Sequence, residues 1–251
     1  MKYSVLQKPR SGYSLTNEDG TSKSSVVFLH DALGSALQWQ SFPKSIANAL
    51  PVDVYVYNRQ GHDGQISSPK YWGEDYLHRE AEELHRLVTD LGLQKPVLIG
   101  SSDGGSIAWI YASKYPVKAL VSMAGHYKVD QETVEGVLNT GESLKPLIQK
   151  LVQYHGANAQ ALVTQWYKRW TSPEFKSWSI KPLLEQINCP CLHLQGDKDS
   201  YASAQHHLEA AEFIGANAKA ITLDNTGHFP HIEHQAVTIH HIKQFLEAVL
   251  R

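Results

Sequence analysis

The sequence has few cysteines and methionines and almost no uncompensated charge. Its 251 residues include two cysteines and two methionines, and its 23 basic residues nearly balance its 25 acidic ones. It has no basic run and no basic patch interleaved with aromatic residues, which argues against a nucleic-acid partner and against a membrane-surface helix. The first thirty residues hold no long apolar run, so neither a signal peptide nor a transmembrane helix is expected.

The two cysteines, Cys189 and Cys191, are separated by one residue and cannot form a C-x-x-C redox pair. They are expected to be small residues of the core, and the expected location is a reducing cytoplasm. The length suits one large α/β domain, and an apolar content of 42% supplies a sizeable core. The sequence leaves a monomer and a dimer equally open.

Short apolar runs alternate with helical patterns along most of the chain. Strands that alternate with helices predict an α/β fold, with a mostly parallel central sheet and helices on both faces. A weak pair of strands at the start predicts a hairpin at the sheet edge. The expected strands lie at 3–7, 13–16, 25–29, 52–57, 97–99, 119–123, 189–195 and 218–223, and the expected helices at 36–50 (with a break or a fresh start at Pro43), 75–91, 203–214 and 233–249.

The alternation stops between residues 126 and 186. This segment has helical patterns and many bulky aromatic residues, among them Trp166 and Trp170. Ligands of open α/β sheets bind at the carboxyl ends of the strands. We therefore expect residues 126–186 to form a helical cap (lid) over that edge, inserted between core segments 1–125 and 187–251. The two tryptophans are then predicted to contact the substrate in a partly apolar pocket.

One expected strand leads directly into a G-x-S-x-G motif. Residues 97–99 form the apolar run, Gly100, Ser102 and Gly104 supply the motif, and helical spacing of apolar residues follows. A strand, a tight turn and a helix in this order are typical of a nucleophile elbow, which places the serine at its apex. Ser102 is favoured over Ser101, because only Ser102 has glycines two residues away on both sides. The alternative is a turn without chemistry.

A serine hydroxyl needs a base, and the base needs an acid that orients it. The strand at 189–195 ends in G-D-K-D, which offers Asp197 and Asp199, and the last strand leads into D-N-T-G-H-F-P, which offers His228. The order serine, aspartate, histidine accompanies this type of elbow. All three residues follow strands of one parallel sheet, so they are expected at the same edge.

Fourteen histidines make any single one a weak indication of function. His228, His231 and His234 lie at the three-residue intervals of a metal cluster. Pro230 interrupts the helical spacing that would align them, so neither a metal nor another cofactor is expected.

An oxyanion hole requires two backbone N–H donors. One is expected from Asp103, directly after the nucleophile. The second is expected from Ala32, in the loop H-D-A that follows the strand at 25–29. We interpret His30 as a structural residue that holds this loop.

These motifs resemble those of α/β-hydrolase fold enzymes over nearly the whole chain. The resemblance is carried by F-L-H-D-A-L-G-S, Y-N-R-Q-G-H-D-G, G-S-S-D-G-G, G-D-K-D and N-T-G-H-F-P-H-I-E-H. It is strongest to small capped serine hydrolases, including valacyclovir-hydrolase-like and biphenyl-hydrolase-like esterases. The resemblance implies Ser102 as nucleophile, Asp199 as acid and His228 as base. The family usually has glycine where this chain has Asp31, which predicts a less permissive backbone in the oxyanion loop.

The sequence therefore predicts a serine hydrolase that cleaves a small-molecule carboxylic ester or a related acyl bond through an acyl-enzyme. The same triad also serves carbon–carbon bond hydrolases and lactonases, so that alternative stays open. A non-catalytic small-ligand receptor on the same fold is the alternative from another class. Asp103 has a second predicted role, binding a cationic amine on the substrate. The alternative is that it only complements the positive end of its helix.

Overall fold

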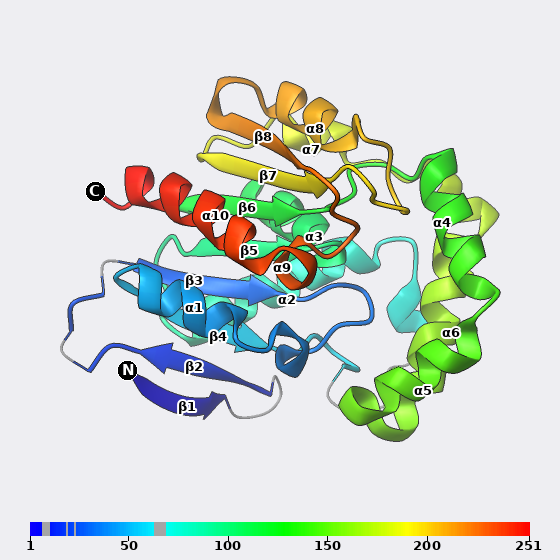
Figure 1. Cartoon of the computed structure of the whole chain (residues 1–251), viewed down its shortest axis with the longest axis horizontal. Coiled ribbons are helices and arrows are strands. Elements are labelled where there is room, and N and C mark those ends of the chain that lie inside the picture. The colour runs from blue at the N-terminus through cyan, green and yellow to red at the C-terminus, as the bar shows by residue number, and fades with distance from the viewer. Residues whose placement is uncertain (7–10, 19, 23, 63–68) are drawn as a thin grey trace.

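The computed structural model describes residues 1–6, 11–18, 20–22, 24–62 and 69–251. Figure 1 shows a central sheet with helices on both faces, and both termini lie away from the cap segment. The strands of the described chain run in the order β1-β2-β4-β3-β5-β6-β7-β8. Their bounds are β1 (Lys2–Leu6), β2 (Gly12–Thr16), β3 (Ser24–Leu29), β4 (Val52–Tyr57), β5 (Val97–Ser101), β6 (Ala119–Met123), β7 (Cys191–Gly196) and β8 (Ala218–Leu223).

The six strands from β3 to β8 pair with one another in parallel. β1 and β2 form an antiparallel hairpin, and β2 pairs antiparallel with β4. The predicted edge hairpin is thus confirmed, although Gln7 of its first expected strand lies outside the described residues. The fold class predicted from the sequence, a mostly parallel sheet in an α/β fold, is confirmed as well.

Side chains of β3 alternate between the two faces of the sheet, because successive residues of a strand point to opposite sides. Val26 and Phe28 join the core on one face, and Val27 and Leu29 join the core on the other. The first face is covered by α1 (Phe42–Ala49) and α10 (Gln235–Val249). The second is covered by α2 (Tyr76–Asp90), α3 (Asp103–Ala112) and α8 (His206–Ile214).

Two expected helices are each divided. The helix expected at 36–50 is a 3-10 turn, η1 (Ala36–Trp39), followed by α1. The break falls at Gln40, whose φ is 50°, and Pro43 marks the fresh start, since it lies in the first turn of α1 where a missing N–H costs no hydrogen bond. The helix expected at 233–249 is preceded by a separate short helix, α9 (Pro230–Glu233).

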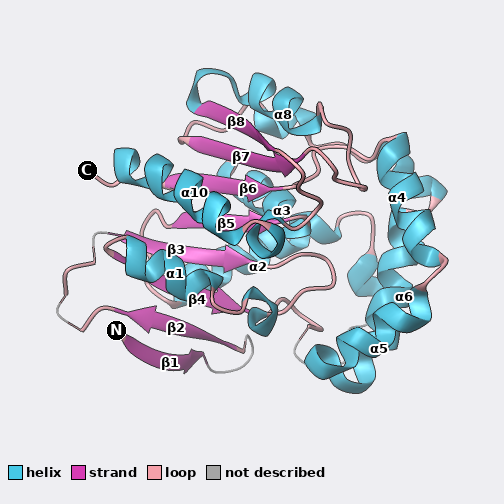
Figure 2. Cartoon of the chain, viewed as in Figure 1, coloured by secondary structure: helices cyan, strands magenta, loops and turns pink. Residues whose placement is uncertain are grey.

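The segment between β6 and β7 consists of helices joined by loops (Figure 2). α4 (Gln131–Gly141), α5 (Leu144–His155) and α6 (Ala159–Trp170) stand together beyond the carboxyl ends of the strands (Figure 1). α7 (Lys181–Leu184) packs instead against α3 and α8. The cap boundaries at 126 and 186 stay a prediction. The remaining 3-10 turns are η2 (Pro69–Trp72), η3 (Gly156–Asn158), η4 (Pro173–Ser177) and η5 (Gly215–Asn217).

The cysteines are buried and unbridged, with their sulfur atoms 3.8 Å apart. Within the described ranges, every helix is too short or too polar to cross a lipid bilayer.

Candidate active site

Ser102 sits at a sharp turn between β5 and α3. Its φ of 52° and ψ of −119° lie in a region that non-glycine residues rarely adopt, and its N–H donates to the carbonyl of Met123 in β6 (2.8 Å). The two glycines of the motif are required by close packing: a Cβ at Gly100 would collide with the main chain of Gly104, and a Cβ at Gly104 with the carbonyl of Leu29. The sequence therefore builds a strand-turn-helix elbow at the predicted place.

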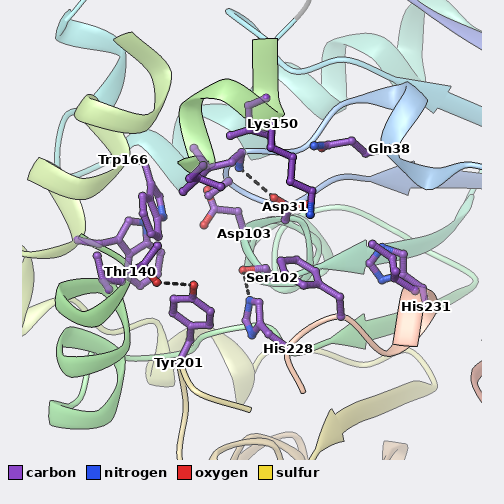
Figure 3. A pocket seen from close by; sticks show the side chains of 18 of the residues that line it. Asp31, Gln38, Ser102, Asp103, Thr140, Lys150, Trp166, Tyr201, His228 and His231 are labelled. Carbon is purple, nitrogen blue, oxygen red and sulfur yellow. Dashed lines mark hydrogen bonds between the residues drawn. The ribbon is translucent and has the colours of Figure 1, made fainter. Parts of the chain in front are cut away.

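The serine, histidine and aspartate selected from the sequence come together at this edge of the sheet. Figure 3 shows His228 and Ser102 facing each other. His228 Nε2 lies 2.9 Å from Ser102 Oγ, and His228 Nδ1 lies 2.9 Å from each carboxylate oxygen of Asp199. Asp197, the other acid of the G-D-K-D turn, instead accepts the N–H of Thr226 (3.2 Å).

The electrostatics of the pair suit a general base. Burial alone would lower the pKa of His228, but the charge and hydrogen bonds of Asp199 outweigh it and raise that pKa above its ordinary value. Burial opposes the charge on Asp199, yet the facing imidazole lowers the pKa of this carboxyl below its usual range. Because the carboxylate takes the Nδ1 hydrogen, the lone pair of Nε2 faces the serine hydroxyl.

The two expected oxyanion donors lie on either side of Ser102. Ala32 follows β3 and lines the cavity, and Asp103 begins α3. Neither backbone N–H donates to another residue in the part of the chain that the structure describes. Asp31 lies outside the left-handed backbone region, so this loop does not need the glycine that the resemblance led us to expect.

The Asp103 side chain is buried and already paired. Its Oδ2 accepts from Arg59 Nη1 (3.3 Å) and from the Tyr76 hydroxyl (2.9 Å), to which Trp170 Nε1 also donates (3.0 Å). Its Oδ1 has no hydrogen-bond partner among the described residues. Burial raises the pKa of Asp103, against the opposing charge of Arg59. The structure thus supplies an ion pair at the place predicted to bind an amine.

A cavity of about 340 Å³ opens above Ser102 and His228. Trp166 and Trp170 of α6 line it, as expected from their place in the cap segment (Figure 3). The predicted contact with substrate is not tested by this geometry.

Two residues of the cavity wall, His126 and Tyr201, were not predicted from the sequence. His126 Nε2 bonds to the carbonyl of Tyr201 (3.0 Å), and the Tyr201 hydroxyl bonds to Thr140 of α4 (2.7 Å). Burial, and then the neighbouring His206 and His228, lower the pKa of His126 to about 4, so it is neutral at physiological pH. His126 lies shortly after the end of β6 and Tyr201 shortly after the end of β7. A position just after a strand end, which also marks Asp199 and His228, is therefore the sequence signal that could have indicated them.

The three histidines with metal-like spacing have different surroundings. His228 lies between Ser102 and Asp199, the ring of His231 packs on Trp39 (4.6 Å between centroids), and His234 Nε2 faces the carbonyl of Asn225 (3.2 Å).

A serine elbow on a mostly parallel sheet, with an aspartate and a histidine delivered by later strand ends, defines the α/β-hydrolase fold. The sequence model of the alpha/beta hydrolase family matches residues 26–240. The chain belongs to this family, and the resemblance drawn from its motifs is confirmed at that level.

Similar proteins span several activities. The human serine hydrolase BPHL is 25% identical over 181 residues, which cover 68% of this chain but only 60% of the human protein. The mouse sn-1-specific diacylglycerol lipase ABHD11 is 24% identical, over 87% of this chain and 79% of its own. The structure of a bacterial membrane phospholipase A matches with a TM-score of 0.79 and 19% identity, over 99% of this chain and 86% of that one, which shows the fold alone.

Proposed function

We propose that this protein is a serine hydrolase of small-molecule carboxylic esters or related acyl compounds, with Ser102, His228 and Asp199 as its triad. The observation that carries the proposal is the unbroken chain of 2.9 Å contacts from Ser102 Oγ through His228 to Asp199, beside a cavity. Membership of the family and the names of its relatives, a serine hydrolase and a lipase, agree with it.

In the proposed reaction, His228 Nε2 removes the hydroxyl proton as Ser102 Oγ attacks the substrate carbonyl. Asp199 holds the Nδ1–H tautomer and stabilises the imidazolium that forms. The N–H groups of Ala32 and Asp103 stabilise the tetrahedral oxyanion. His228 then protonates the leaving group, and the same histidine activates the water that releases the acyl group. Apart from the substrate and this water, these steps use side chains and backbone groups of this chain.

The cavity limits the size of the substrate. A volume of about 340 Å³ lies at the small end of ligand pockets. Aromatic side chains from α6 supply apolar surface, with Trp166 and Trp170 as the proposed substrate contacts. A cytoplasmic location stays a prediction.

The test is covalent labelling followed by a substrate panel. A fluorophosphonate is expected to attach to the peptide that contains Ser102, and p-nitrophenyl esters of short acids are expected to be hydrolysed with a burst of p-nitrophenol. Lactones, thioesters and vinylogous diketones complete the panel. Turnover of the diketones alone would favour the carbon–carbon bond hydrolase. An unlabelled protein that binds the same esters without turning them over would favour the receptor.

The proposed amine contact of Asp103 has its own test. Asp103→Asn is expected to lower kcat/KM for α-amino esters about tenfold more than for the matching esters without the amine, because a hydrogen bond to a charged group contributes about 1.5 kcal/mol or more. The ratio of the two substrates cancels any general damage to the site. Equal losses on both would assign Asp103 to the structural alternative.

A further inference from the structure

Two successive carbonyls of the loop that follows β3 are held by buried side chains. The carbonyl of Asp31 accepts from Arg59 Nη2 (2.7 Å) and from His30 Nδ1 (2.8 Å), in addition to the backbone N–H of Gly34 (3.1 Å). The carbonyl of Ala32 is held by His62 Nε2 (2.9 Å). A surface loop seldom receives so many buried donors, since most loop carbonyls are solvated.

The third carbonyl in the row, that of Leu33, is contacted by a residue of the cap segment. His155, at the end of α5, places Nε2 2.8 Å from the Leu33 oxygen and Nδ1 3.2 Å from the carbonyl of His62. We place the ring hydrogen on Nε2, which makes the shorter contact.

The tautomer of His30 follows from its neighbours. The backbone N–H of Arg59 donates to His30 Nε2 (3.0 Å), so Nε2 is an acceptor and Nδ1 carries the hydrogen that Asp31 receives. Burial, and then the charge of Arg59, lower the pKa of His30 well below its ordinary value, which keeps the ring neutral. This agrees with the structural role expected for His30.

Holding the Asp31 oxygen fixes the direction of the next N–H. In a trans peptide the C=O and the N–H lie in one plane and point in opposite directions. The N–H in the plane of the Asp31 carbonyl is that of Ala32. With the oxygen held on the side of Arg59 and His30, this N–H is turned to the opposite side, where Ala32 lines the cavity.

The same guanidinium reaches the second donor. Arg59 Nη1 pairs with Asp103 Oδ2 (3.3 Å), and both side chains are fully buried. Asp103 supplies the other backbone N–H, at the start of α3. One planar group therefore contacts the Asp31 carbonyl, which shares a peptide with the Ala32 N–H, and the carboxylate of Asp103, which supplies the second donor.

We propose that Arg59 is a positioning residue of the oxyanion hole: its guanidinium sets the separation and orientation of the Ala32 and Asp103 N–H groups. The inference rests on the proposed serine hydrolase function and adds a residue to it. Arginine suits this role because its donors have a fixed planar geometry, whereas a lysine ammonium is a single point that cannot span both acceptors in the same way.

The test compares Arg59→Lys with Arg169→Lys. Arg169 also donates to a main-chain carbonyl, with Nε 2.7 Å from the oxygen of Trp72, but it touches neither oxyanion donor. On an ester that wild type hydrolyses and Ser102→Ala does not, Arg59→Lys is expected to lower kcat about 10²-fold, the effect of losing one oxyanion donor, with KM changed less than about threefold. Arg169→Lys is expected to keep both values.

A second readout separates positioning from general stability. A trifluoromethyl ketone labelled with ¹³C at the carbonyl forms a hemiketal with the serine, and its chemical shift reports ionisation of the oxyanion. The oxyanion is expected to ionise at a higher pH in Arg59→Lys than in wild type or Arg169→Lys, since a displaced donor stabilises the anion less. A role in folding alone lowers the melting temperature and leaves this titration unchanged.

The outcomes are distinguishable. If wild type hydrolyses no member of the panel, the proposed function fails. If wild type is active and folded Arg59→Lys keeps its kcat and its hemiketal titration, the positioning role is wrong. Arg59→Gln replaces the lysine variant if the latter does not fold. Loss of the fold in both variants also overturns the proposal, because Arg59 is then a residue of the general core.

Discussion

Ser102→Ala is expected to reduce kcat for ester hydrolysis by about 10⁴- to 10⁶-fold while the ester still binds. The loss is large because the hydroxyl removed is the one at the apex of the elbow, 2.9 Å from His228 Nε2. What survives is the contribution of the oxyanion donors and of binding, which work without a nucleophile. Steady-state hydrolysis of a p-nitrophenyl ester and loss of fluorophosphonate labelling measure the effect.

Ser101→Ala is the matched control. Ser101 is the adjacent serine of the same motif and is also buried, but it ends β5, and its hydroxyl has no hydrogen-bond partner among the described residues. Its replacement is expected to leave kcat within about threefold of wild type, as for a substitution outside the reacting groups. Adding His228→Ala to Ser102→Ala is expected to cost little more, because triad residues act as a unit. Full activity of Ser102→Ala would end the triad assignment.

Asp199→Asn is expected to lower kcat by about 10⁴-fold with little change in KM, the effect of this exchange in a serine-protease triad. The asparagine amide donates to Nδ1 and so favours the tautomer with hydrogen on Nε2, which cannot accept the serine proton. Asp197→Asn is the control from the same turn, because Asp197 bonds to Thr226 and not to the histidine.

The pH profile of Asp199→Asn gives an independent check. The charge of Asp199 raises the pKa of His228, and catalysis needs this base unprotonated. Wild-type kcat/KM therefore falls as the pH drops below that raised pKa. Removing the charge lowers the pKa, so the acid limb of the residual activity is expected to move to lower pH. An acid limb at the same pH in both proteins would contradict the assignment of His228 to this pair.

The proposed triad could be predicted from the sequence because each of its residues follows a strand, and the carboxyl ends of parallel strands lie at one edge of the sheet. Local patterns alone located the elbow at Ser102. The residues of the cavity wall could be predicted less well from the sequence. His126 and Tyr201 meet only because the loops after β6 and β7 converge, and Tyr201 reaches α4 through Thr140. Such contacts depend on how the cap segment docks, which no short pattern encodes.

The oxyanion loop shows a different limit. The sequence showed an unusual Asp31 and predicted a stiffer backbone, whereas the structure places that residue outside the left-handed region. In the sequence, Arg59 was only one letter of the motif Y-N-R-Q-G-H-D-G, with no role of its own. Its contacts with the Asp31 carbonyl and with Asp103 join residues 28 and 44 positions apart, so only the folded chain reveals them.

The contact between His155 and the Leu33 carbonyl joins α5 of the cap segment to the loop that follows β3. When α5 moves away, this bond breaks and the Leu33 carbonyl, two peptide units beyond the one that carries the Ala32 N–H, loses its donor. We therefore expect the loop that carries the Ala32 N–H to be held most firmly when α5 is docked against it. Esters with long acyl chains or bulky alcohols that displace α5 would then bind but be hydrolysed slowly. Selectivity between substrates would appear in kcat rather than in the affinity for the substrate.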